Sequence, residues 1–360
     1  MAERPTSDLA VYRARPTVRV DGRENPRVSE LLLGMEMTES EGGMSAVELR
    51  FSNVASDPRG GADLAFEDDA ILKLGARLAV YTGDENEPRE IFQGAITGLE
   101  AEFPQGGPPE LVVLAEDRFQ QARRKRRTKV FENVSVSDIA NQLAGDLGLR
   151  PIVNADTPPV TEVQLNESDL VFLRRLASRY DLDLQVVGEE LHLSARSDVR
   201  RGAVDLALHS QLRRARVLAD LSHQSTKITT RGWDRGAKQS ARGEGSGANL
   251  SPGTGRTGSQ VLRQTLGERT DHVAHLALAN DREASAVADA VFDSRARRFV
   301  CVDGTAEGNP ALRVGTHVTL TGLGPRFSNT YYIVRACHRY DVQRGYETDF
   351  EAECAYLGRQ

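Results

Sequence analysis

The sequence has no apolar run that approaches the roughly 20 residues a bilayer-spanning helix requires. Its first residues, 1–8, also lack the basic and then apolar pattern of a secretion signal. We therefore expect a chain that is made in the cytoplasm without a signal peptide and that does not insert into a membrane.

Cysteine is scarce, and no pair has the C-x-x-C spacing of a redox or zinc motif. The three cysteines, Cys301, Cys337 and Cys354, each lie in an apolar, strand-like stretch. An odd number in a chain of 360 residues argues against a disulfide scaffold, which is typical of much shorter secreted proteins. We expect these thiols to be reduced and buried.

A positive net charge is also missing. The formal net charge is −6, which argues against a dedicated nucleic-acid-binding protein. The hydrophobic share of 39% and the charged share of 27% are those of an ordinary soluble globular protein. A length of 360 residues is enough for two or three domains, each with its own core.

Catalytic signatures are missing as well. His272 and His275 have no third ligand and no glutamate of an H-E-x-x-H motif, so a polar surface turn is the preferred interpretation. The glycine-rich segments 243–247 and 253–258 lack Gly-Lys-Ser/Thr and a strand-to-helix context, so they do not predict a phosphate loop. No Ser-His-Asp or Cys-His set has a recognisable signature. We expect no catalytic residue, no metal, no cofactor and no enzymatic activity.

What the sequence does contain is a β pattern interrupted by an α+β segment. Short apolar stretches with frequent glycine and proline turns fill the first third, which is typical of a barrel or sandwich. The predicted fold class is mainly β with α+β insertions and with two similar antiparallel β-barrel domains. The predicted domains are 1–125 (first barrel), 126–200 (α+β), 201–235 with 298–360 (second barrel) and 236–297 (an inserted flexible loop and a helix).

The middle segment has helical spacing. Ser135-Val-Ser-Asp138 fits a capping box, and apolar residues four apart follow it. A second helix is predicted to begin at Asn166-Glu-Ser-Asp169, with Leu173 and Leu176 on its buried stripe. Farther along, segment 237–260 is rich in Gly, Ser, Thr and Asn, which predicts a mobile loop.

One apolar pattern occurs twice, in Leu72-Lys-Leu-Gly-Ala-Arg-Leu-Ala-Val80 and in Leu312-Arg-Val-Gly-Thr-His-Val-Thr-Leu320. Gly75 and Gly315 are predicted to take a turn conformation that a Cβ disfavours. A chain with two similar barrels presents two quasi-equivalent faces. Three such chains could form a ring of six faces that mates with threefold and sixfold partners.

Three groups of residues resemble segments of VgrG proteins and phage late control gene D proteins. They are the helix opening 164–177 with Asn166, Glu167, Ser168 and Asp169, the strand end Gly232, Trp233 and Asp234, and the terminal pattern with His338, Tyr340, Gly345 and Tyr346. The resemblance extends, with gaps, over residues 31–355.

This resemblance implies a baseplate hub: a homotrimer that forms a pseudo-sixfold ring and joins the hexameric inner tube protein to a trimeric spike protein. It also implies contacts with other baseplate components and a place in the baseplate of a contractile injection system or phage-like tail. VgrG chains continue into a spike, whereas this sequence ends at Gln360, so we expect the spike to be a separate protein. Two alternatives stay open: a tail-associated cell-wall hydrolase, and a carrier whose segment 237–260 grips effector cargo.

A dense basic run is a candidate partner contact. It comprises Arg123, Arg124, Lys125, Arg126 and Arg127. Such a run could contact DNA or an acidic protein in a channel. The acidic net charge and the lack of interleaved aromatic residues favour a protein partner.

Overall fold

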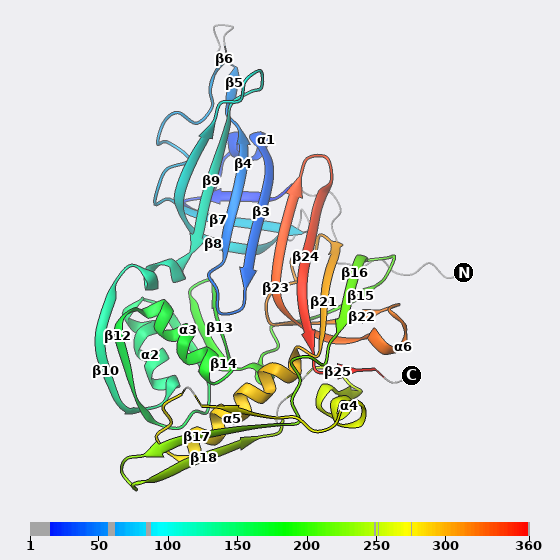
Figure 1. Cartoon of the computed structure of the whole chain (residues 1–360). Helices are drawn as coiled ribbons and strands as arrows, with labels where there is room; N and C mark the ends of the chain where they lie inside the picture. The colour runs from blue at the N-terminus through cyan, green and yellow to red at the C-terminus, as the bar shows by residue number, and fades with distance from the viewer. Residues whose placement is uncertain are drawn as a thin grey trace.

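The computed structural model describes residues 15–56, 62–83, 88–247, 250, 252–274 and 276–358. The chain is mainly β, and one large, mostly antiparallel sheet passes through two groups of strands with separate hydrophobic cores (Figure 1). We call these groups the first unit and the second unit. Helices gather in two further regions below the sheet, so the prediction of a mainly β chain with α+β insertions is confirmed.

The first unit covers residues 17–117. Its elements are β1 (Thr17–Val20), β2 (Arg23–Glu24), α1 (Pro26–Leu31), β3 (Leu32–Ser40), β4 (Ala46–Ser52), β5 (Val54–Ser56), β6 (Ala62–Leu64), β7 (Arg77–Gly83), β8 (Pro88–Glu102) and β9 (Glu110–Asp117). Alternate residues of β4 are buried, namely Val47, Leu49 and Phe51. This period of two places one face of the strand on a core and the other toward solvent.

The second unit is discontinuous in sequence. Its elements are β15 (Gly202–Ala207), β16 (Leu212–Ala219), β21 (Val300–Glu307), β22 (Thr316–Thr321), α6 (Gly324–Phe327), β23 (Asn329–Asp341), β24 (Gly345–Cys354) and β25 (Tyr356–Leu357). Val318, Leu320 and Ile333 are fully buried in its core. Cys337 and Cys354 are buried free thiols, whereas the free thiol of Cys301 is partly exposed.

The two units join where β23 pairs with β3. The register extends from Arg335 opposite Ser40 to Asp341 opposite Gly34. The strand order in the described part of the chain is therefore continuous: β16-β21-β24-β23-β3-β4-β9-β8-β7-β1-β2. β22 pairs with β23 beside this path, and β15 pairs with β22.

The two units repeat the same strand order and register. Strands β3-β4-β9-β8-β7 correspond to β16-β21-β24-β23-β22. Two irregularities in pairing fall at matching positions. The first lies between Leu32 and Gly34 in β3 and between Leu212 and Arg214 in β16. The second lies between Ile96 and Gly98 in β8 and between Ile333 and Arg335 in β23. Because bulges fix local register and twist, their repetition indicates a structural duplication rather than a chance likeness of hairpins.

The sequence repeat lies at the entry to β7 and β22. Gly75 and Gly315 have φ angles of 83° and 85°, so the predicted left-handed turn is confirmed at both. The Gly75 N–H donates to Ile96 O at 2.8 Å, and the Gly315 N–H donates to Ile333 O at 3.0 Å. These two acceptors precede the matching bulges of β8 and β23.

The middle region connects the units. Its elements are a 3-10 helix (Arg118–Arg123), β10 (Arg126–Val134), α2 (Val136–Asp146), β11 (Arg150–Asn154), β12 (Val160–Ser168), α3 (Asp169–Arg179), β13 (Leu182–Val187), β14 (Glu190–Ala195) and a second 3-10 helix (Arg196–Asp198). Ser135 and Asp138 form the predicted capping box of α2. Helix α3 was predicted to begin within residues 166–169. Its N-cap residue is Ser168, so the helix itself begins at Asp169.

A hairpin–helix region separates β16 from β21. Its elements are β17 (Lys227–Asp234), β18 (Gln239–Gly245), β19 (Arg256–Thr257), α4 (Gly258–Thr265), β20 (Thr270–Val273) and α5 (Asp281–Arg297). The expected mobile loop over 237–260 is wrong for much of its length. Strand β18 pairs with β17 over its full length, and α4 already begins at Gly258. Residues 248, 249 and 251 lie outside the described residues.

Close packing, not flexibility, explains the glycines of β18. A Cβ on Gly243 would lie 2.2 Å from the backbone carbon of Ala284, and one on Gly245 would lie 2.4 Å from that of Ala288. Both alanines belong to α5, so only glycine lets this strand lie directly on the helix. Glycine content alone does not separate a loop from such a contact.

The location of β17 also differs from the predicted domains. In the described part of the chain β17 pairs with β18 and β20, and with no strand of the second unit. Residues 227–234 therefore lie apart from the rest of the predicted second barrel, 201–235 with 298–360. No helix among the described residues is long and apolar enough to cross a membrane.

Candidate functional site

The terminal motif residues lie at the junction of the two units. His338 and Tyr346 are fully buried, and His338 Nδ1 is 2.8 Å from Tyr346 Oη. Thr82 of the first unit donates to the same Tyr346 oxygen at 3.0 Å. Tyr340 is 7% exposed and, like Tyr346, belongs to the core of the first unit. Gly345 has a φ of 80° in the turn that brings these strands together.

The histidine of this junction is neutral. Burial, together with the nearby charge of Arg313, lowers the pKa of His338 to about 3. A neutral imidazole can exchange a hydrogen bond with Tyr346 without placing a charge in the core. His338 therefore orients Tyr346 between the two units.

An ion pair between a buried carboxylate and the half-buried Arg313 forms a second link across the same junction. Glu39 of β3 is 3% exposed. One of its carboxylate oxygens accepts from Val314 N at 2.6 Å, and the other accepts from Arg313 Nη2 at 2.6 Å. A buried carboxylate is tolerated because both oxygens have strong donors.

The middle region attaches to the second unit through Asp183. Tyr332 of β23 donates to Asp183 Oδ2 at 2.8 Å, and Arg201 Nη1 donates to the same oxygen at 3.2 Å. Arg196 lies 5.1 Å from the centroid of the Tyr332 ring and pairs with Glu353 at 3.1 Å. Burial lowers the pKa of Arg196 to about 10. Charged side chains thus hold the first unit, the middle region and the second unit in one arrangement.

The 166–169 motif forms the link between β12 and α3. Asn166 has a φ of 49°, which redirects the chain before the helix. Ser168 caps α3 by accepting from Val171 N at 3.4 Å. Asp169 is 2% exposed and accepts from Gln164 Nε2 at 2.9 Å. These residues therefore have local structural roles.

Other motif positions fix α3 on its neighbours. Glu167 pairs with Arg175 through both carboxylate oxygens, at 3.2 Å and 3.1 Å. Leu173 and Leu176 are fully buried, as predicted from the helical spacing. The motif thus explains how α3 is placed, and it contains no exposed reactive group.

The basic run lies between the first unit and the middle region. Arg127 donates to Asp169 Oδ2 at 2.6 Å and to Asp146 Oδ2 at 2.8 Å. The other arginines of the run also contact this chain: Arg123 pairs with Glu116, Arg124 contacts Gln120, and Arg126 contacts Asn166 O. Lys125 is exposed. Much of the run is therefore structural, and its role in partner contact remains a prediction.

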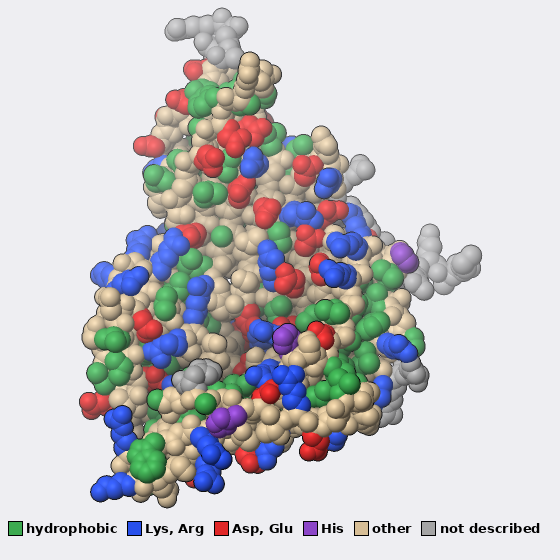
Figure 2. Space-filling view, in the orientation of Figure 1, with side chains coloured by type: hydrophobic (Ala, Val, Ile, Leu, Met, Phe, Trp, Pro, Cys, Tyr) green, Lys and Arg blue, Asp and Glu red, His purple; other side chains and the backbone are tan. Residues whose placement is uncertain are grey.

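Gly232, Trp233 and Asp234 end β17 near the tip of its hairpin with β18. Gly232 has no room for a side chain, because a Cβ would lie 2.4 Å from Leu278 O. Asp234 Oδ1 accepts from Ala237 N at 2.9 Å and closes the turn. Trp233 is 58% exposed, and Figure 2 shows a hydrophobic group flanked by Lys and Arg side chains at this end of the molecule.

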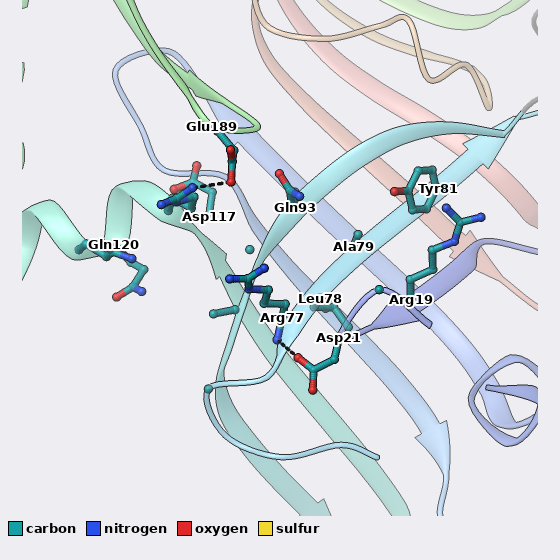
Figure 3. A pocket seen from close by; sticks show the side chains of 16 residues that line it. Arg19, Asp21, Arg77, Leu78, Ala79, Tyr81, Gln93, Asp117, Gln120 and Glu189 are labelled. Atoms are coloured by element: carbon teal, nitrogen blue, oxygen red, sulfur yellow. Dashed lines mark hydrogen bonds and ion pairs between the residues drawn. The ribbon is translucent and has the colours of Figure 1, made fainter. Parts of the chain in front are cut away.

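A cleft of about 610 Å³ lies between the first unit and the middle region (Figure 3). Asp117 is buried at its edge, with one carboxylate oxygen accepting from Ser45 N at 2.6 Å and the other from Phe119 N at 2.8 Å. Burial raises the pKa of Asp117 to about 6. A raised pKa in a cleft can mark a catalytic acid, but here both oxygens cap backbone N–H groups.

The other carboxylates of the cleft are also engaged. Asp21 Oδ1 accepts from Arg77 N at 3.0 Å, and Glu189 pairs with Arg118 at 2.7 Å (Figure 3). These contacts fix the walls of the cleft rather than present a carboxylate pair to a substrate. His272 lies in β20 with its Nδ1 3.1 Å from Thr229 Oγ1, and His275 lies outside the described residues.

Two exposed hydrophobic side chains at edges of the large sheet were not predicted. Phe103, just beyond β8, is 67% exposed, and Leu218 of β16 is 56% exposed. Aligning Ile96 and its seven following residues with Ile333 and its followers would have placed Phe103 against Tyr340. Extending the sequence repeat past its first strand was therefore the signal that could have singled out Phe103, and we find no such signal for Leu218.

Two solved structures with a similar fold are described as tail proteins. The 43 kDa tail protein of prophage MuSo2 from Shewanella oneidensis has a TM-score of 0.67 and 14% identity, covering 94% of this chain and 97% of that chain. A tail protein from Neisseria meningitidis has a TM-score of 0.64 and 12% identity, covering 95% of this chain and 99% of that chain.

A third similar structure comes from Escherichia coli. It is a component of the type VI secretion system with structural similarity to the T4 bacteriophage tail proteins gp27 and gp5, and it has a TM-score of 0.61 and 15% identity. The similarity covers 95% of this chain and 79% of that chain. At these identities the likeness shows a shared fold.

No curated protein matches the sequence. A family model described as the Alg8 N-terminal domain matches residues 54–341. Its description differs from the late control gene D and VgrG proteins that the motifs resemble, so that narrower assignment remains a proposal. Because the match covers well over half of the sequence, this chain belongs to the Alg8 N-terminal domain family.

Proposed function

We propose that this chain is a structural baseplate hub of a contractile injection system or phage-like tail. In this proposal three chains form a ring, and each chain contributes two similar barrel-like units. The ring joins a hexameric inner tube to a trimeric spike made from a separate protein. The chain would be made in the cytoplasm and then built into the baseplate with other components.

The observation that carries this proposal is the duplication of register within one chain. The two units share strand order, two bulge positions and a glycine turn with φ angles of 83° and 85°. Three chains with two equivalent units each present both threefold and near-sixfold symmetry. A joint between a sixfold tube and a threefold spike requires that combination.

The shared fold supports a tail role, and the motifs support the narrower family. The similar structures with their tail and type VI secretion descriptions have the same fold over nearly the whole chain. The motif residues of the late control gene D and VgrG resemblance lie at the unit junction, at the start of α3 and in β17. Their positions suit a scaffold that works by assembly rather than by catalysis.

The structure lends the cargo alternative less support than the hub. That alternative required a mobile segment 237–260, whereas β18 is paired with β17 and packs on α5. The hydrolase alternative required a free carboxylate pair, and the carboxylates described in the cleft are held by backbone N–H groups or by arginine. Neither alternative gains a supporting contact from the residues that the structure describes.

Mass measurement tests the proposal. Light scattering of the purified protein should give a trimer, and the protein should copurify with tube, sheath and spike proteins of a particle. A strictly monomeric protein that is absent from such particles would contradict the hub function.

A further inference from the structure

Besides the outer edges of β2 and β15, two further strand edges of the large sheet are open in the described part of the chain. Over residues 98–102, β8 pairs with β9 on one edge, and no described strand pairs with the other edge. Strand β16 ends the strand order and, among the described strands, pairs with β21 alone. Open edges present unpaired N–H and C=O groups that can pair with another chain.

In the second unit, the edge of β23 that corresponds to the open edge of β8 is paired with another strand. Residues 335–341 of β23, which correspond to 98–104, pair with β3 on the edge that β22 leaves free. Strand β3 in turn corresponds to β16, with a bulge at the matching position. The same joint, made by the first unit, would bring β8 against β16. These strands lie far apart in the strand order of one chain, so this β16 must come from a second copy.

We propose that the free edge of β8 pairs antiparallel with β16 of a second copy of this chain. The register of β23 with β3 sets the opposing residues as Leu99 with Ala219, Ala101 with Val217, and Glu102 with Arg216 of the second copy. The inference rests on the proposed trimeric hub and specifies how neighbouring chains meet in it. A head-to-tail joint of this kind can close into a ring without leaving either edge open.

The two edges have opposite charges. Over the open part of β8, residues 98–102, the exposed charged side chains are Glu100 and Glu102, and those of β16 are Arg213, Arg214 and Arg216. Glu102 opposite Arg216 reverses the internal joint, in which Arg339 lies opposite Glu36. Opposite charges across paired strands are stabilising. Pairing of β16 with β16, or of β8 with β8, would oppose like charges, so the edges select each other over themselves.

Phe103 is an independent indication of the same joint. It is 67% exposed, whereas the corresponding Tyr340 is 7% exposed in the core of the first unit. In the proposed register Phe103 lies opposite Ala215 of the second copy, which packs against the core of the second unit. Formation of the joint would therefore bury Phe103 in the way that the internal joint buries Tyr340.

Paired cysteines test the register. Glu102→Cys and Arg216→Cys are introduced together into the full chain, with Cys301→Ser so that the partly exposed native thiol does not compete. Mild oxidation should give covalent chain-to-chain products on a non-reducing gel. The matched control carries Val217→Cys in place of Arg216→Cys. Its thiol lies on the opposite face of β16 and should give no cross-link, because successive side chains alternate.

Light scattering of the same samples separates this joint from the hub function. Trimers with the Glu102–Arg216 cross-link support both. Trimers without it, or equal cross-linking of the Val217 control, overturn the joint and leave the hub intact. Monomers without a cross-link overturn both proposals.

Discussion

The first and second units have the same register but differ in what covers them. In the second unit the middle region covers the outer face of β22 and β23, where His317 Nε2 is 3.0 Å from Val199 O and Arg196 lies over the Tyr332 ring. The corresponding face of the first unit, which includes Arg77 of β7, lines the open cleft (Figure 3). One copy of the unit thus supports another region of its own chain, and the other copy remains open.

This difference teaches how a duplicated unit can specialise. The contact of β23 with β3 is satisfied within the chain and is reinforced by Glu39 and His338. At the matching position in the first unit, Ala101 replaces that histidine, and the strand edge has no described partner. A permanent internal joint and an assembly joint can therefore share one geometry while differing in their buried polar groups.

The largest expected effect comes from breaking the internal joint. Glu39→Ala should lower the free energy of unfolding by about 3–5 kcal/mol, because the buried Val314 N–H and the half-buried Arg313 both lose their carboxylate acceptor. Urea unfolding measures this loss. The matched control is Glu36→Ala on the exposed face of the same strand, which should change stability by less than about 0.5 kcal/mol. Equal effects of the two changes would mean that the Glu39 link does not hold the units together.

Gly75 and Gly315 test the difference between the open face of the first unit and the covered face of the second unit. Gly75→Ala and Gly315→Ala place an alanine at nearly the same positive φ, which costs about 1–2 kcal/mol at each site. A Cβ at Gly75 meets nothing within 4 Å, whereas one at Gly315 would lie 2.5 Å from Arg201 Nη1. Arg201 is held by Asp183 and cannot simply move away.

The Gly315 variant should therefore lose about 1–3 kcal/mol more than the Gly75 variant, since overpacking adds to backbone strain. Urea unfolding of both variants measures this difference. Equal losses would show that the middle region yields freely at this contact.

Acid should weaken the junction between the two units through His338. Its pKa of about 3 in the folded chain lies below that of a free histidine, about 6.5. As the pH falls through this window the unfolded chain binds a proton that the folded chain does not, so stability decreases. Relative to His338→Gln, the wild-type chain should lose about 2 kcal/mol between about pH 6.5 and about pH 5. A stability difference that does not change with pH would contradict the neutral, buried state of His338.

The sequence was informative where a local conformation demands particular residues. Gly75 and Gly315 require a positive φ, and Ser135 with Asp138 satisfies the first turn of α2, so these features could be predicted from neighbouring residues alone. The junction depends on contacts between distant residues, such as Glu39 with Val314. Such partners cannot be identified from spacing along the chain.

One error and one incomplete interpretation have the same physical origin. The glycines of 237–260 were interpreted as flexibility, but Gly243 lets β18 approach α5. The basic run was interpreted as a candidate partner contact, which stays a prediction, but Arg127 already has internal partners, Asp146 and Asp169. Composition gives the chemical type of a residue, and only the tertiary fold shows whether its contacts are already made.

The smallest expected effect on stability comes from Phe103. It distinguishes the internal joint of β23 with β3 from the proposed joint of β8 with β16 between copies. Phe103→Ala should change the free energy of unfolding by less than about 0.5 kcal/mol, because the side chain is 67% exposed in the single chain. Tyr340→Ala, at the corresponding position of the second unit, should cost about 3–5 kcal/mol, because that side chain is buried. In light scattering, Phe103→Ala should nevertheless weaken chain association. A Phe103→Ala chain that is both fully stable and fully associated would remove this aromatic from the contact between copies.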